Sequence, residues 1–107
     1  MGLLLAQAKI AQLNSYRADL EYNVNLIMST KTNLAKQVTE LTNLGSDMDV
    51  DSPEMKALEE KLARLKEVDK ALDQKMQNYQ TQLELVDSQM QYAQQMRSSA
   101  IQRNTMG

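Results

Sequence analysis

The sequence contains no cysteine and no histidine, and it also lacks phenylalanine and tryptophan. Without cysteine there is no disulfide framework and no thiol chemistry, and without histidine the common nucleophile–base pairs and zinc sites are missing. The 107 residues include only three glycines and one proline, which argues against a sheet protein with many turns. We therefore expect no catalytic residue, no metal site and no cofactor.

Charge and hydropathy restrict the partners. Twelve basic and fourteen acidic residues give a formal net charge of −2, so no basic excess is present to neutralise phosphates. We expect no nucleic-acid binding, and no stretch is long and apolar enough to predict a membrane span. The first residues lack the basic segment of a signal peptide, and Ala6 stands where a myristoylation motif needs Ser or Thr. An exported chain would therefore leave by a route without a cleaved signal.

Apolar residues recur in two heptad seams, each alternating steps of three and four without a slip. The first seam runs from Ala6 to Leu41 and the second from Met55 to Ala100. This spacing places each seam on one stripe of an α-helix and predicts helices at about 3–44 and 52–103. The residues predicted to hold the two helices together are Leu13, Leu20, Ile27, Leu34, Leu41, Leu58, Leu62, Leu65, Leu72, Met76, Tyr79, Leu83 and Val86.

A single connection at 45–51 separates the two predicted helices. Gly45 fits the left-handed position that follows many helices, and Asp51 or Ser52 is a suitable N-cap before Pro53 in the first turn of the second helix. The fold class is therefore all-α, and we expect residues 1–107 to form one antiparallel, coiled-coil-like two-helix hairpin. The same seams would also serve a domain-swapped arrangement, in which the second helix pairs with another copy.

Three long charged side chains and one aspartate interrupt the seams. If Leu41 lies across from about residue 59, Lys31 lies near Asp69, and such a pair would fix the register of the helices. The alternative is that each of these two side chains extends to water. Arg17 and Arg97 are predicted to have no partner within the hairpin, so they are either solvated or paired with another subunit.

The connection contains alternating aspartates, Asp47, Asp49 and Asp51, which is how a calcium-binding loop opens. Such a loop needs glycine at its sixth position and glutamate at its twelfth, where this chain has Ser52 and Leu58. We expect the acidic residues to be solvated and to complement the dipole of the following helix.

Charge is unevenly distributed along the two helices. More than half of the residues between Glu54 and Lys75 are charged, whereas the two ends of the chain are rich in Gln, Asn, Ser and Ala. Charge-poor helix faces can be buried against other protein, although a glutamine-rich face also remains soluble in water. The predicted subunit contacts on these ends are Leu4, Ala8, Ala11, Ala18, Tyr22, Met90, Tyr92, Ala93, Met96 and Ala100.

The long helix, the turn with Asp51-Ser52-Pro53 and the second helix with its Gln/Ser-rich tail resemble type III secretion needle subunits. The terminal helices of flagellins are similar in the same way. This resemblance implies a bacterial structural subunit that self-assembles into a helical filament or tube, without catalysis. It also implies an extracellular or cell-surface location and an export machinery as a partner.

Two other interpretations remain open. The chain can be a coiled-coil adaptor or export chaperone that binds a partner helix, which would allow a cytoplasmic location. It also resembles in length the secreted dimeric hairpins of about one hundred residues, but these have a Trp-x-Gly turn where this chain has only Asn43-Leu44-Gly45.

Overall fold

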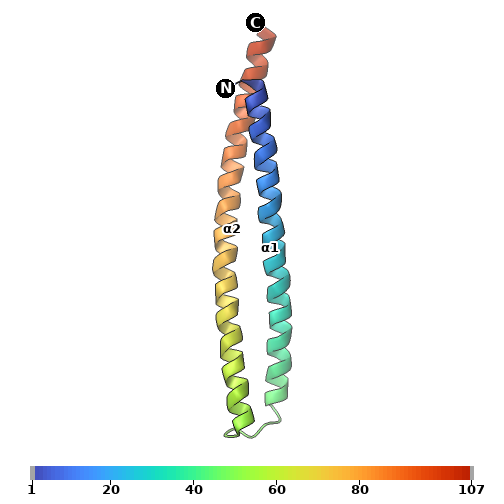
Figure 1. The fold of residues 1–107 in the computed structure, drawn as a ribbon, viewed down its shortest axis with the longest axis vertical. Coiled ribbons are helices and arrows are strands. Elements are labelled where there is room, and N and C mark those ends of the chain that lie inside the picture. Colours follow the sequence, from blue (N-terminus) through green and yellow to red (C-terminus); the bar gives the residue numbers. More distant parts are fainter. Residues whose placement is uncertain (1, 107) are drawn as a thin grey trace. The chain divides into compact units, whose positions relative to one another are not determined.

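The fold is a two-helix hairpin. The computed structural model describes the backbone of residues 2–106 and the side chains of residues 2–104. Helix α1 spans Leu3–Gly45 and helix α2 spans Pro53–Met106, joined by one short connection (Figure 1). Strands are absent from this described part of the chain. The predicted all-α class and the predicted helical hairpin are confirmed, and α2 continues three residues beyond its predicted end at 103.

The hairpin divides into two compact units. The terminal unit consists of Met1–Val24 and Asn78–Gly107, and the turn unit consists of Asn25–Gln77. Each unit contains a segment of α1 and an antiparallel segment of α2. Because long helices are held mainly by the packing of their apolar stripes, the core of each unit explains its stability.

The terminal unit has a well-buried core. Leu13 and Leu20 of α1 pack with Val86, Met90 and Ala93 of α2, and the partly buried Ile10, Tyr79 and Leu83 pack against this cluster. Val86 is only 1% exposed. All of these residues belong to the two heptad seams, so the three–four spacing places them on facing stripes of the two helices.

The turn unit is less deeply packed. Ile27, Leu34 and Leu58 are its buried apolar side chains. The remaining apolar seam residues of this unit are half-buried: Val38, Leu41, Met55, Leu62, Leu65, Leu72 and Met76. A two-helix pair covers only one stripe of each helix, and this unit illustrates that limit.

Ser52 is the N-cap of α2. Its hydroxyl oxygen accepts a hydrogen bond from the backbone N–H of Met55 at 3.1 Å, and the hydroxyl donates to the Asp49 carbonyl at 2.9 Å. Pro53 follows at the first helical position, where no N–H is required. Of the two predicted caps, Asp51 and Ser52, the structure uses Ser52, and Glu54 adds a negative charge at the positive end of the helix dipole.

Gly45 lies within α1, which corrects the prediction that it would adopt the left-handed conformation after the helix. No glycine in the described part of the chain has a positive φ. Gly45 is buried, and a Cβ atom at this position would overlap Cδ2 of Leu58 and contact Met55. A larger residue at this position would therefore require the Leu58 side chain to move. The connection runs from residue 46 to residue 52.

Candidate functional site

The two units differ in their content of charged residues. The turn unit contains eighteen of the twenty-six charged residues of the chain. The terminal unit has almost the same length and contains only eight, four of each sign: Lys9, Arg17, Asp19, Glu21, Glu84, Asp87, Arg97 and Arg103. A large part of its exposed surface therefore consists of amides, hydroxyls and apolar groups.

The side of α1 that faces away from the core is exposed in the terminal unit. Leu4 is 83% exposed and Tyr22 is 68% exposed, and the predicted contact residues between them, Ala8, Ala11 and Ala18, are exposed as well. Ser15 continues the same three–four spacing. We call these six residues the α1 outward face. These six residues are exposed because the core of the unit is formed by the seam residues on another side of α1.

The predicted contacts on α2 fall into two groups. Tyr92 is 60% exposed, Leu85 about two turns earlier in α2 is 59% exposed, and Met96 is half-buried. In contrast, Met90, Ala93 and Ala100 are all less than 5% exposed and belong to the buried core of the hairpin. This corrects the prediction that these three residues are subunit contacts. They occupy seam positions, and α1 covers that seam, so no surface remains there for another chain.

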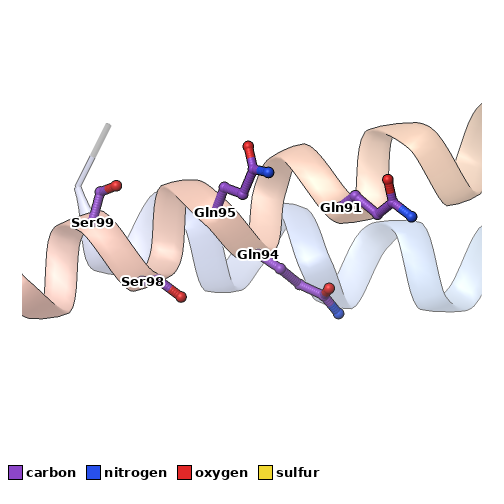
Figure 2. A pocket seen from close by; sticks show the side chains of 5 residues that line it. All are labelled: Gln91, Gln94, Gln95, Ser98 and Ser99. Atoms are coloured by element: carbon purple, nitrogen blue, oxygen red, sulfur yellow. The ribbon is translucent and has the colours of Figure 1, made fainter.

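An open pocket on α2 contains no charged group. Gln91, Gln94, Gln95, Ser98 and Ser99 line it, and all five are exposed. Figure 2 shows that these side chains project from a single helix, α2, with α1 behind it. Amides and hydroxyls can donate and accept hydrogen bonds but do not titrate near neutral pH, so this surface is suited to contact rather than to acid–base chemistry.

A second open pocket of the terminal unit lies along α1. It is lined by Lys9, Gln12, Leu13, Ser15, Tyr16 and Asp19 of α1 and by Gln89 of α2. Lys9 and Asp19 are ten positions apart, so a cation and an anion lie about 15 Å apart along this pocket. Nearby, the Tyr16 hydroxyl donates a hydrogen bond to Oε1 of Gln82 at 2.9 Å and links the two helices.

Arg17 has a partner within the hairpin, which shows that the prediction of an unpaired Arg17 was wrong. Its Nη2 donates to Oδ1 of Asp87 at 2.6 Å. The sequence argument considered only seam residues, whereas Asp87 follows the seam residue Val86 and is reached because the arginine side chain is long. Arg97, the other arginine predicted to lack a partner, is half-buried.

Lys31 is the centre of a polar layer in the turn unit. Its Nζ donates to Oδ1 of Asp69 at 2.9 Å, as the assumed register predicted, and also to Oδ1 of Asp73. The hydrogen bonds to Asp73 and to Asp69 raise the pKa of Lys31 above its ordinary value of 10.5. Asp73 was not predicted, although it follows Asp69 by four residues and therefore lies on the same side of α2.

Three further findings bear on function. Among the described residues, no group of three or more acidic side chains is arranged to hold a metal ion. Neither helix, over its described length, has an apolar stretch of the kind that crosses a membrane. No protein-family model, curated protein or solved structure matches this chain.

Proposed function

We propose that this protein is a non-catalytic structural subunit that self-assembles through its terminal unit into a filament or tube. The observation that carries the proposal is the α1 outward face, where Leu4 and Tyr22 are mostly exposed beside a complete core. Large exposed apolar side chains on a surface with few charges are typical of protein contacts. The highly charged turn unit would face solvent in such an assembly.

The finer parts of the proposal rest on the resemblance to needle subunits and flagellins. These parts are a bacterial filament, an extracellular or cell-surface location, and export without a cleaved signal. Two features support the likeness: the chain is a hairpin of two long helices, and the second helix begins with the Ser52 cap and Pro53. The same surfaces would suit the alternative function, an adaptor or export chaperone that binds one partner helix.

The first experiment measures the mass of the purified chain. Light scattering and sedimentation velocity from micromolar to millimolar concentration, with negative-stain microscopy of the same samples, should show large particles that grow with concentration. Regular filaments or tubes would support the proposed assembly. A single monomeric species over the whole range would overturn it and would favour a search for a partner helix.

A matched pair of variants locates the contact. Tyr22→Glu places a charge on the exposed side of α1 in the terminal unit and should abolish assembly, because desolvating an unpaired carboxylate is costly. Val50→Glu adds the same charge at an apolar residue of the turn unit that is 79% exposed, and it should leave assembly unchanged. Equal effects of the two variants would argue against the terminal unit as the contact. Ala93→Glu is unsuitable as a test of assembly, because Ala93 is 1% exposed and a carboxylate there would disrupt the core of the hairpin.

A further inference from the structure

We infer that oxidation of two seam methionines of α2, Met55 and Met76, by a hydroperoxide loosens the turn unit and leaves the terminal unit intact. Loosening here means that the backbone hydrogen bonds of the turn unit open more often. The inference goes beyond the proposed function, because it concerns the packing of the hairpin and does not depend on whether the chain assembles.

Methionine supplies all the sulfur of this chain, which has eight methionines and no cysteine among its 107 residues. When hydrogen peroxide oxidises a methionine, the O–O bond breaks, one oxygen atom forms an S=O bond, and the other leaves as water. The product, methionine sulfoxide, is polar where the thioether was apolar. Methionine sulfoxide reductases reverse the reaction, so any structural effect of it is reversible as well.

The seam methionines all lie on α2. Met55, Met76 and Met90 occupy seam positions, whereas the seam of α1 contains no methionine. The Sδ atom of Met55 lies 3.6 Å from the place where a Cβ atom of Gly45 would stand, so Met55 packs against the end of α1. The register given by the interhelical ion pairs places Met76 near the level of the buried Ile27. A sulfoxide at either position therefore introduces a polar group into an apolar seam, where it lacks a hydrogen-bond partner from water.

Burial distinguishes the seam methionines of the two units. Met55 and Met76 of the turn unit are half-buried, so a molecule as small as hydrogen peroxide reaches them in the folded hairpin. Met90 of the terminal unit is 4% exposed and belongs to the core cluster, so its oxidation requires that core to open first. The same treatment therefore modifies the seam of one unit before it modifies the seam of the other.

Methionines outside the seams provide internal controls. Met28 of the turn unit is 55% exposed, so it is oxidised early and its sulfoxide remains in water. Met48 of the connection and Met96 of the terminal unit also lie outside the seams, although both are half-buried. An effect that follows oxidation of these three residues alone is not the effect inferred here.

The test treats the full-length chain with hydrogen peroxide and measures the sulfoxide at each methionine over time by peptide mass spectrometry. Oxidation should proceed in the order Met28, then Met55 and Met76, and last Met90. Samples taken before Met90 reacts are examined by hydrogen exchange. Amides of the turn unit should exchange about tenfold faster than in the untreated chain, because the desolvated sulfoxides favour local opening. Amides of the terminal unit should keep their rates, and treatment with the reductases should restore the turn unit.

A double variant with Met55→Leu and Met76→Leu isolates the two side chains. Leucine has a similar volume, so it keeps the seam packed, and it cannot form a sulfoxide. After peroxide treatment this variant should exchange at the untreated rate, although Met28 and Met48 are still oxidised. The matched control is Met28→Leu, which should respond to peroxide as the wild type does. Circular dichroism of the untreated chains verifies that both variants are folded.

The outcomes separate this inference from the proposed function. Sulfoxides at Met55 and Met76 without faster exchange in the turn unit overturn the inference, and so does a failure of these two residues to react in the folded chain. Equal acceleration in the double variant and in the wild type assigns the effect to other residues and also overturns it. Light scattering of the same samples reports assembly independently, so a monomeric chain that loosens as described supports this inference while it overturns the proposed function.

Discussion

Arg17 of α1 and Asp87 of α2 form an ion pair across the terminal unit, with Nη2 and Oδ1 2.6 Å apart. The arginine occupies a seam position between Leu13 and Leu20, and most positions of this seam hold apolar residues. Its Nε is buried and has no hydrogen-bond partner. The guanidinium thus gains one ion pair and leaves one donor unsatisfied, and these two effects oppose each other in the free energy of unfolding.

The first prediction concerns this balance. Arg17→Leu should raise the free energy of unfolding by about 1 kcal/mol, because leucine fits the apolar seam and removes the unsatisfied Nε. Asp87→Asn should lower it by less than about 1 kcal/mol, since both side chains of the pair are partly exposed. Urea unfolding followed by circular dichroism, at concentrations too low for assembly, measures both changes. A less stable Arg17→Leu chain would mean that the ion pair outweighs the unsatisfied donor.

The second prediction concerns pH and Lys31. Hydrogen bonds to Asp73 and Asp69 hold the pKa of Lys31 above its ordinary value of 10.5 in the folded state. The stabilisation from this layer is therefore complete below that value and is lost as the pH rises through the higher folded-state pKa. Unfolding free energies of the wild type and Lys31→Arg, compared from neutral to strongly alkaline pH, should diverge only in the alkaline range, because arginine keeps its charge. Parallel curves would contradict this assignment.

The third prediction concerns the apolar seam of the terminal unit. Leu20→Ala should lower the free energy of unfolding by about 2–4 kcal/mol, because Leu20 is 3% exposed and packs in the core cluster. Leu85→Ala removes the same atoms from an exposed position of the same unit and should change it by no more than about 0.5 kcal/mol in the monomer. Thermal or urea unfolding of the two variants distinguishes the seam from the outer surface. Similar losses would mean that Leu85 is part of the core.

The heptad pattern predicted the hairpin because the spacing of apolar residues determines which stripe of each helix is buried. Even the Lys31–Asp69 contact followed from register, since two antiparallel helices with a short connection have little freedom to slide. Position alone did not reveal Asp87 or Asp73, because long cationic side chains reach residues that flank the seam. The misassignment of Met90, Ala93 and Ala100 has a different cause. The charge-poor segment in which they lie suggested a contact with another chain, but their heptad positions place them in the core.

The role of Gly45 could not be predicted from sequence for a different reason. A glycine at the end of a helical pattern usually indicates a left-handed residue, and only the position of the other helix shows otherwise. In this fold, Leu58 of α2 occupies the space where a Cβ of residue 45 would lie. The constraint on residue 45 is therefore one of packing against the Leu58 side chain, thirteen positions further along the chain.

The fourth prediction tests this packing. Gly45→Ala should lower the free energy of unfolding by about 1 kcal/mol, because overlap with the buried Leu58 outweighs the better helix propensity of alanine. In a Leu58→Ala background the space is free, so the same substitution should become stabilising, by up to about 1 kcal/mol. Gly2→Ala is the control, because an added Cβ there would have no non-neighbouring atom within 4 Å, and it should change the free energy of unfolding little. A sign that does not reverse in the Leu58→Ala background would show that backbone conformation, rather than contact with α2, requires glycine at this position.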